Sequence, residues 1–570
     1  LRPGGRWITW AAPGFECAVI VSPHRTDVFV EQGASGLLVG LGLAPGGSAG
    51  AAAMSMCGGE CDVGPAGVGS VAIDNMSEGI CSAVFYDKES EELVASSDRT
   101  GMWGLYYAED RSGIWLSSSS LAIGCLRSVS FDQAAFGAMR AAGYLLGDIS
   151  LFNEVKRLGA GERLVVNRSG LRIERWWSPP EVRSGADLRE ETANFVEGVH
   201  ARLRAGIGSE CALTTLTAGL DSRCLLALVR GSGLAARFFT AASESLVDVE
   251  LAAQVARRLG LSWFELVPKE QDAEGFRRMI TLSTLLCDGE NQPFRGTTYW
   301  SAALAGLSAP VLWGIGGEAW RRYWSKQESA RLVLKGRTPL QRLVKHRMAA
   351  WSLPLEILAS PMPRDPDDIA CGLLRPDYDV FATRTVEERL EALYLSQRTR
   401  RWASCHLKTM AWWIQPELPF IGQKLVEQAY GLPMSIRDGG QIFRGAIWQC
   451  MPSAGRIPHN EGYHTLPRTE ATFTDQFRAV RLESAKLLRK IYPGSSERVT
   501  HDRGGVVLTY RECFGDLLDP SRMVSRFLYR GKPLADRLEP LLDKPAGSAG
   551  MVNGILGLEI ALRSATRLQT

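Results

Sequence analysis

The feature that most constrains this chain is an alternation of short apolar strands and amphipathic helices between about residues 187 and 266. A helical pattern over 187–205 precedes the strand-like segment ALTT, a tight loop and the helix-like segment RCLLALVRG. The pattern then repeats with RFFTAAS, with the helix VELAAQVARRLG that Gly260 ends, and with WFELV. This order is typical of a parallel sheet with right-handed crossover helices. We therefore predict an α/β domain that turns mostly helical after about residue 275, with one further strand at APVLWGIGG.

A different pattern occupies the N-terminal part of the chain. Short alternating segments over 79–123, spaced by about ten residues, predict an antiparallel sheet, and 157–177 predicts a further hairpin. The Gly-, Ala- and Ser-rich residues 33–70 predict a flexible insertion or a long loop. The stretch WWSPP before residue 181 is typical of a linker. The expected domains are 1–180, 181–470 and a C-terminal helical extension at 471–570.

Composition excludes several classes of protein. With 570 residues, 45% apolar and 22% charged, the chain is globular and long enough for more than one core. Its 65 Lys and Arg against 62 Asp and Glu give a net charge of +3, which predicts no surface for nucleic acid. No apolar run reaches the roughly 18 residues that cross a bilayer. Scattered cysteines suit a reducing compartment, so we expect a cytoplasmic protein with no membrane partner.

The loop at 217–223 (TAGLDSR) carries the clearest chemical signal. Gly219 would let backbone N–H groups turn inward at the start of a helix, and Thr217 and Ser222 add hydroxyl donors, which together favour a phosphate cradle. Asp221 has the wrong charge to bind phosphate, so its natural role is to hold Mg²⁺ against the phosphates. The loop lacks the Walker pattern. A tight strand-to-helix turn without a ligand is the alternative.

The same loop resembles the SGG-x-D-S pyrophosphate loop of the asparagine synthetase family. Other segments resemble elements of that family in the same order over roughly 180–465: Phe239-Thr240, VDVELAAQVARRLG, WGIGGEAWRRYW, PELPFIGQKLVEQAYGLP and FRGAIWQCMPSAGRIP. Residues 77–124 and 157–177 resemble the glutamine amidotransferase domain of the family. The resemblance implies an α+β N-terminal domain of degenerate Ntn-amidotransferase-like antiparallel sheets. An α/β PP-loop (HUP-like, parallel-sheet) ATP-pyrophosphatase domain with a helical C-terminal part would follow.

The resemblance also implies ATP and Mg²⁺ as cofactors and assigns site residues. Those assigned to ATP and pyrophosphate are Leu216, Thr217, Gly219, Leu220, Asp221, Ser222, Thr240, Gly314 and Gly316. Those assigned to Mg²⁺ are Asp221 and Glu318, the latter standing where the family has its second carboxylate.

Three departures from the family pattern qualify this expectation. The catalytic Lys expected shortly after Pro458 is missing; Arg444, Arg456 or Arg468 could replace it, and we take Arg444 with Asp221 and Glu318 as the catalytic set. Ile315 replaces the proton-transfer residue of both asparagine synthetases and β-lactam-forming relatives. Cys17 lies inside a predicted strand and cannot supply the α-amine that an N-terminal nucleophile uses as base, so we expect no glutaminase activity. The chain begins at Leu1, and its natural start stays open.

The implied function is an ATP-dependent ligase that adenylates a small-molecule or peptide carboxylate for attack by ammonia or a substrate amine. A macrolactam or β-lactam-type cyclase and a catalytically degenerate binding or scaffold protein are the alternatives, and a homodimer or a pathway partner protein is open. Three charged segments allow two interpretations each: 288–290 is substrate-facing or an exposed turn, 321–322 binds an acidic substrate or is a solvated helix face, and 398–401 is an anion site or a helix surface.

Overall fold

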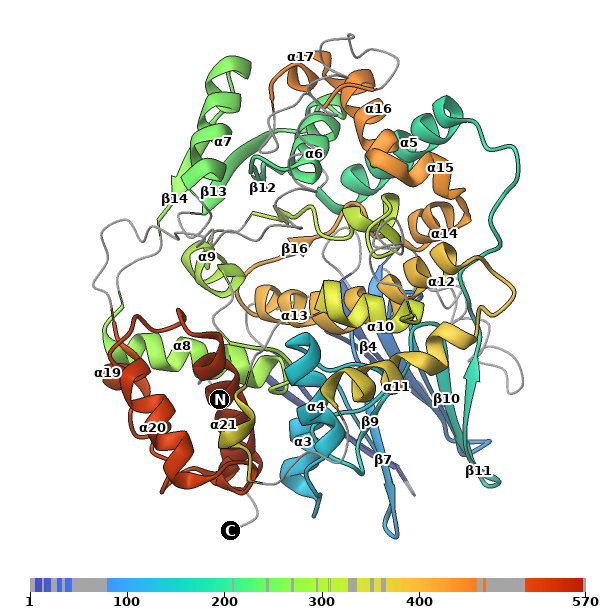
Figure 1. Ribbon diagram of the computed structural model, residues 1–570. Coiled ribbons are helices and arrows are strands. Elements are labelled where there is room, and N and C mark those ends of the chain that lie inside the picture. Colours follow the sequence, from blue (N-terminus) through green and yellow to red (C-terminus); the bar gives the residue numbers. More distant parts are fainter. Residues whose placement is uncertain are drawn as a thin grey trace.

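The chain forms two sheet systems joined by helices (Figure 1). The computed structural model describes residues 6–12, 15–21, 28–32, 36–43, 79–207, 210–241, 246–267, 271–293, 296–305, 307, 309–326, 336–348, 353–359, 365–458, 465–467 and 508–566. In Figure 1 the antiparallel strands lie at the bottom, the parallel strands near the top, and helix α13 (Ser404–Trp413) between them. No helix among the described residues is long and apolar enough to cross a membrane.

The N-terminal part consists of antiparallel sheets. A six-stranded sheet has the order β11-β10-β6-β5-β4-β3, a three-stranded sheet the order β8-β7-β9, and β1 pairs with β2. Their bounds are β1 Arg6–Ala12, β2 Phe15–Val21, β3 Val28–Gln32, β4 Gly36–Leu43, β5 Ile80–Asp87, β6 Glu92–Ser97, β7 Tyr106–Asp110, β8 Gly113–Ser117, β9 Lys156–Arg157, β10 Glu162–Asn167 and β11 Gly170–Arg175. The strands predicted within 79–123 and the hairpin within 157–177 are confirmed, and Cys17 lies within a strand as expected.

One prediction in this part was wrong. Residues 36–43, taken as part of a flexible insertion, form β4, which pairs with β5 along its whole length from Gly36 opposite Asp87 to Leu43 opposite Ile80. The alternation of Leu and Val with small residues suits a central strand, and it outweighs the glycines that suggested a loop. The rest of that expectation, residues 33–35 and 44–70, lies outside the described residues.

The C-terminal half contains the predicted parallel sheet. Its order is β14-β13-β12-β15-β16, with every neighbouring pair parallel. The bounds are β12 Ala212–Thr215, β13 Ala236–Ala241, β14 Trp263–Leu266, β15 Val311–Leu312 and β16 Pro416–Glu417, with helices α5 Leu188–Ile207, α6 Leu220–Gly231 and α7 Leu246–Leu259. The sequence indicated all of these except the two-residue β16. Because the chain adds β13 and β14 on one side of β12 and β15 and β16 on the other, the strand order reverses between β12 and β15. Open α/β sheets bind ligands beyond the carboxyl ends of the strands at such a reversal.

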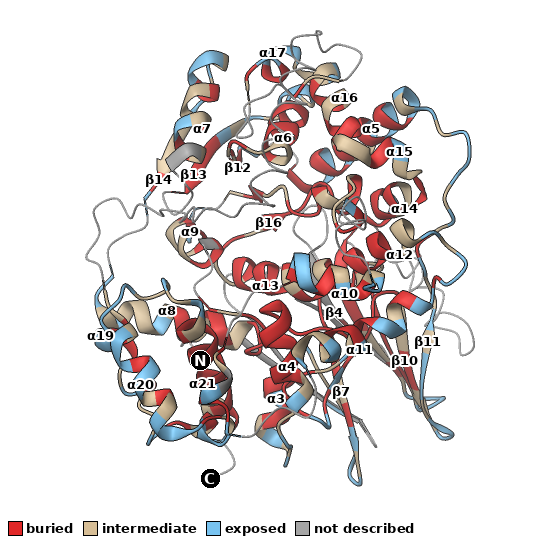
Figure 2. Cartoon of the chain, in the orientation of Figure 1, coloured by how far each residue is buried: buried red, intermediate tan, exposed pale blue. Residues whose placement is uncertain are grey.

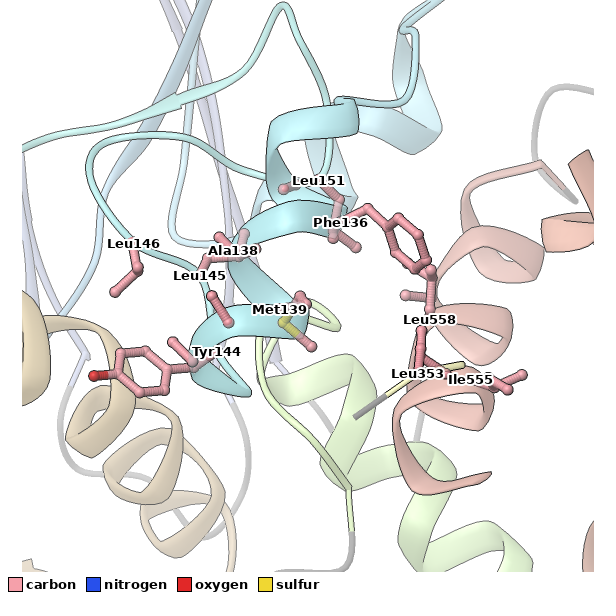
Figure 3. Close-up of a cluster of buried hydrophobic side chains, with 14 of the residues drawn as sticks. Phe136, Ala138, Met139, Tyr144, Leu145, Leu146, Leu151, Leu353, Ile555 and Leu558 are labelled. Carbon is pink, nitrogen blue, oxygen red and sulfur yellow. The ribbon is translucent and has the colours of Figure 1, made fainter. Parts of the chain in front are cut away.

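The helical C-terminal part packs on both halves. Helices α19 (Tyr510–Phe514) and α21 (Gly550–Thr566) contact α8 (Ala273–Leu286), α20 (Gly531–Leu542) contacts α19, and α21 contacts α3 (Ser120–Leu126). Figure 3 shows Phe136 and Met139 of α4 (Gln133–Ala142) close to Ile555 and Leu558 of α21 in one buried cluster. The helices predicted within 471–570 therefore share a core with the N-terminal part instead of extending the α/β domain alone.

A buried set of charges joins the two halves. Glu290, 2% exposed, accepts a hydrogen bond from the Tyr106 hydroxyl at 2.8 Å and forms ion pairs with Arg401 at 3.3 Å and Arg157 at 3.8 Å. Asp288 lies 3.1 Å from the Lys408 ammonium. The alternative of an exposed turn at 288–290 was wrong, since both carboxylates are buried among groups from the two halves.

The basic segment 398–401 is likewise not a helix surface throughout. Arg400 donates to the Gly147 carbonyl at 2.7 Å and to Asp148 at 2.6 Å, and Arg401 donates to the Ile149 carbonyl at 2.8 Å. Figure 2 shows α13, which follows directly, coloured buried along most of its length. Because this helix is covered from both sides, buried polar groups rather than an amphipathic stripe mark it in the sequence.

Replacing Glu290 with Gln is expected to lower stability strongly, because it leaves Arg157 and Arg401 buried without their counter-charge. Breaking a buried ion pair by removing one partner costs about 3–5 kcal/mol, so the urea midpoint and the melting temperature should both fall. Glu274→Gln is the matched control, since Glu274 is exposed and pairs only with Arg278 one turn along its helix. Equal midpoints for the two variants would contradict a joining role for Glu290.

Candidate functional site

The structure brings Asp221 and Glu318 together at the reversal of the strand order. Asp221 lies in the first turn of α6, directly after β12, and Glu318 lies in the short 3₁₀ helix η1 (Gly317–Trp320) that follows β15. β12 and β15 are parallel neighbours, so both carboxylates lie at the same edge of the sheet. A buried aromatic cluster of Phe195, Trp320, Phe420 and Phe443 packs directly behind η1.

Glycines let the chain before Glu318 pass close to Asp221. A Cβ on Gly317 would lie 3.0 Å from the Asp221 carboxyl carbon, and one on Gly314 would lie 3.7 Å from the Asp221 Cβ. Gly316 has φ +88° and no room for a side chain, because a Cβ there would lie 2.0 Å from Ile421. The GIGG sequence is therefore required by this close approach.

The two carboxylates are incompletely partnered. Arg321 donates to Asp221 Oδ2 at 2.6 Å, whereas Asp221 Oδ1 and Glu318 Oε2 are buried and have no hydrogen-bond partner within the described part of the chain. Burial raises the pKa of Asp221 to about 6; Glu318 adds to the rise and Arg321 opposes it. The site thus holds excess negative charge that a further cation would neutralise.

The donor set fits Mg²⁺ held jointly with phosphate. Mg²⁺ is usually bound in proteins through one or two carboxylates plus substrate phosphates. Within the described residues no group of three or more His, Cys, Asp and Glu side chains could hold a metal ion, so Asp221 and Glu318 supply two ligands at most from this part of the chain. The two unpartnered carboxylate oxygens are the residues' contribution to such an ion.

A buried ion pair holds the segment that carries Arg321. Glu391 accepts hydrogen bonds from the backbone N–H groups of Tyr323 at 2.7 Å and Ser325 at 2.9 Å, and Arg437 lies 3.5 Å from its other oxygen. The second Glu391 oxygen and Arg437 Nε are buried without a hydrogen-bond partner among the described residues. Unsatisfied buried polar atoms are rare in native proteins, and these belong to the ion pair that holds the backbone of Tyr323 and Ser325.

The 217–222 loop differs in detail from the expected cradle. The N–H of Thr217 donates to Ser222 Oγ at 3.1 Å, that of Ala218 to Asp248 at 3.1 Å and that of Gly219 to Thr217 Oγ1 at 3.3 Å. Gly219 has an ordinary φ of −75°, so its conformational freedom is not used. The donors that are left are the N–H groups of residues 220–222 at the start of α6, which no side chain caps. Such helix starts favour anions.

Thr240 and Leu216, which the sequence assigned to nucleotide binding, make hydrogen bonds within the sheet instead. The Thr240 hydroxyl donates to the Leu216 carbonyl at 2.5 Å and accepts from Trp263 Nε1 at 3.0 Å. Leu216 is fully buried, and its N–H donates to the Phe239 carbonyl at 2.8 Å. Their side chains fix the strand end from which the loop starts, so any contact with a nucleotide falls to their backbone.

Arg444, taken from the sequence as the catalytic cation, contacts the backbone instead. It donates to the Gly439 carbonyl at 2.9 Å and to the Leu466 carbonyl at 3.3 Å. Arg456 is exposed and stacks over Trp448, while Arg468 and residues 459–461 lie outside the described residues. The cation that contacts Asp221 is Arg321, which sequence reasoning treated only as an acid binder or a solvated face. Its position three residues after Glu318, in the pattern GGE-x-x-R, was the available signal.

Arg223 links the loop to the chain before residue 459. Its guanidinium is fully buried and donates to the carbonyls of Ala454 at 3.0 Å, Ile457 at 2.9 Å and Pro458 at 3.4 Å. Burial lowers the pKa of Arg223 to about 10. The last residue of TAGLDSR thereby holds the backbone of residues 454–458.

Comparison with known proteins identifies one part of the chain. Residues 66–177 match the family model for a glutamine amidotransferase domain. Residues 66–177 are therefore similar to a glutamine amidotransferase domain, which confirms the amidotransferase part of the resemblance for this segment. No curated protein matches the sequence.

Two solved structures are similar over part of the chain. One is the allosteric regulatory enzyme of purine biosynthesis, with 12% identity, a TM-score of 0.17, and coverage of 45% of this chain and 59% of that one. The other is glutamine phosphoribosylpyrophosphate amidotransferase from B. subtilis complexed with ADP and GMP, with 9% identity, a TM-score of 0.17, and coverage of 44% and 65%. This chain spans less than two thirds of either structure. The assignment of residues 66–177 rests on the family model alone.

Asp221→Asn is expected to leave the fold intact and to be as stable as the parent or more stable at pH 7.5. The unfolded carboxyl ionises near pH 4 and the folded one near pH 6, so the parent loses stability as pH rises through that window and the Asn variant does not. Melting curves at pH 4.5 and 7.5 check this. The melting temperature of the variant, relative to that of the parent, should be higher at pH 7.5 than at pH 4.5. A loss of several degrees at pH 7.5 would show that the Asp221–Arg321 pair is a net stabiliser.

Proposed function

We propose that the protein is an ATP-dependent amide-bond-forming ligase that adenylates a substrate carboxylate and releases AMP and pyrophosphate. The observation that carries this proposal is the pair Asp221 and Glu318 at the strand-order reversal, each with a buried carboxylate oxygen that lacks a partner in the described structure. The uncapped start of α6 beside this pair adds N–H donors of the kind that bind phosphate. An Mg²⁺–ATP complex bound here supplies the leaving pyrophosphate and the electrophilic α-phosphorus.

Each residue then has a defined task in this proposal. Asp221 and Glu318 hold the cation that accompanies the triphosphate, and the N–H groups of residues 220–222 bind phosphate oxygens. Arg321 provides a fixed positive charge beside Asp221 and takes the place of the family's missing Lys in stabilising charge that develops at the α-phosphate. Preorganised charge of this kind is the main contribution that proteins make to phosphoryl and nucleotidyl transfer.

The amine that attacks the acyl-adenylate is ammonia or an amine of the substrate. The amidotransferase-like N-terminal region supports ammonia as the nitrogen source, whereas the position of Cys17 in the interior of a strand favours a substrate amine or free ammonia over hydrolysis of glutamine. A ring-closing cyclase would use an amine within the same substrate. Dependence of product formation on added ammonium distinguishes amidation from cyclisation.

Mg²⁺–ATP binding is the first test. Titration calorimetry should show binding to the parent protein in the presence of Mg²⁺ and none to folded Asp221→Asn, because the variant cannot supply a charged oxygen to the cation. Asp248→Asn is the comparison variant: Asp248 accepts from the loop N–H of Ala218, so its loss should weaken binding only severalfold. Absence of binding to the folded parent would favour a non-catalytic scaffold.

Arg321→Gln tests the assignment of the cation. With an acid found by screening carboxylates for pyrophosphate release, kcat should fall by about 10²–10³, the usual effect of removing a preorganised charge at the reacting group. Arg444→Gln should leave kcat within about tenfold of the parent, because Arg444 acts through backbone carbonyls. A larger loss of kcat in Arg444→Gln than in Arg321→Gln would identify Arg444 as the catalytic cation.

A further inference from the structure

Two buried cysteines meet where the two halves of the protein join. Cys287 is the C-cap residue of α8 and directly precedes the turn 288–290, whose two carboxylates belong to the buried charge network. Cys405 is the second residue of α13 and lies between Arg401 and Lys408, the cations that pair with those carboxylates. The two cysteines are 8% and 4% exposed. A bond between them would tie the turn to α13, the helix between the two sheet systems (Figure 1).

The side chain of Cys287 lies directly against Cys405. The Cys287 sulfur is 3.2 Å from the Cys405 carbonyl oxygen and 3.3 Å from the hydroxyl oxygen of Thr409, one turn further along α13. The Cys405 thiol points toward the preceding turn and donates to the Arg401 carbonyl at 3.3 Å. Arg401 belongs to the π-helical segment Tyr394–Ala403, which runs directly into α13. Both sulfurs therefore lie against the same stretch of helix backbone.

The two thiols differ in acidity. A hydrogen bond from the Cys287 thiol to the Cys405 sulfur lowers the pKa of Cys405 and raises that of Cys287. Burial and Glu290 oppose the lowering of the Cys405 pKa, whereas Lys408 and Arg157 support it. The thiolate is the nucleophilic form of cysteine. Cys405 is therefore the thiol suited to attack an oxidant, and Cys287 is placed to react with it in a second step.

The turn after Cys287 has an unusual backbone conformation. Asp288 has φ +57° and Gly289 has φ +67°, in the left-handed region that residues with a side chain rarely adopt. A Cβ at Gly289 would lie 2.4 Å from the Cβ of Ala561 in α21, so the turn is also pressed against the C-terminal helices. A left-handed residue other than glycine persists only where the surrounding structure holds it. A covalent bond at Cys287 would hold the residue next to it.

We propose that Cys287 and Cys405 form a reversible disulfide on exposure to hydrogen peroxide, and that this bond fastens the turn 288–290 to α13. Disulfides of proteins in reducing compartments are usually transient and redox-sensing, which agrees with the compartment that the scattered cysteines suggest. Hydrogen peroxide is little larger than a water molecule, which suits an oxidant for a buried pair. The inference is independent of the proposed ligase, because no step of it uses ATP or an acid substrate.

The chemistry balances in two steps. The Cys405 thiolate attacks one peroxide oxygen, the O–O bond breaks, and hydroxide leaves and takes up a proton to give water. Cys405 is then a sulfenic acid. The Cys287 sulfur attacks the sulfur of this sulfenic acid, the S–S bond forms, and the hydroxyl group leaves with the thiol proton as a second water. The two sulfurs lose the two electrons that the peroxide gains.

The test is peroxide treatment of the reduced full chain, followed by alkylation and mass spectrometry of the digest without reduction. The parent should lose two thiols per chain and give a peptide pair linked through Cys287 and Cys405, and dithiothreitol should restore both thiols. In Cys287→Ser, Cys405 should stop at the sulfenic acid, which dimedone labels. In Cys405→Ser, Cys287 should stay a thiol. Cys371→Ser is the matched control and should form the linked pair, since Cys371 is also 8% exposed and burial raises its pKa to about 11.

The effect of the bond is measured by urea unfolding of the oxidised and the reduced protein. The bond joins residues 118 positions apart, so it restricts the unfolded chain, and a cross-link over so long a loop is expected to stabilise the fold. The urea midpoint of the parent should rise on oxidation and return with dithiothreitol. Peroxide should not raise the midpoint of Cys287→Ser, which cannot form the bond.

The parent protein alone decides the main outcome, so the inference can be tested even if a variant does not fold. Peroxide that leaves Cys405 a thiol, or a linked pair that joins other cysteines, would overturn the site. Equal urea midpoints for the oxidised and the reduced parent would overturn the fastening of the turn. A Cys287–Cys405 link in a protein that does not bind Mg²⁺–ATP would support this inference and count against the ligase only.

Discussion

The buried charges around Glu290 are the constraint on which the rest of this structure depends. Glu290, Arg157 and Arg401 are each almost completely removed from water, and charges in that position are tolerable only when all of their partners are present. The partners come from the N-terminal sheets, from the turn after α8 and from the π-helical segment. The network therefore forms completely only when both halves are docked, and it fixes one geometry between them.

That geometry extends to the candidate site through a single helix. Going backward along the chain from Arg401, the same helix carries Glu391, whose carboxylate holds the backbone of Tyr323 and Ser325. This places Arg321 against Asp221. A side chain at the domain junction and a side chain at the sheet edge are thus positioned by one rigid element.

The sequence predicted features that depend on neighbouring residues, and it missed contacts between residues far apart along the chain. The strand–helix alternation indicated the parallel sheet because hydrophobic periodicity is local, and TAGLDSR and GIGGE stood out because close backbone approach requires glycine. The Asp221–Arg321 contact joins residues 100 positions apart, and the burial of Arg400 and Arg401 depends on carbonyls more than 240 positions away. No local pattern carries such information. The loop N–H groups were misjudged for a similar reason, since Ala218 is satisfied by Asp248 in the next helix.

The distribution of unsatisfied polar atoms bears on whether the protein is a ligase or a scaffold. Asp221, Glu318 and Arg321 each carry a buried atom without a partner in the described structure, and they lie on α6, on η1 and directly after η1, at the strand-order reversal. Burial and Glu318 together make ionised Asp221 unfavourable in the free protein. Folds keep such local conflicts where function requires them, at a cost in stability. A chain retained only for its shape would lose nothing by replacing Asp221 and Glu318 with neutral residues. Their presence together, in the elements that directly follow the adjacent strands β12 and β15, supports a site built for a charged ligand.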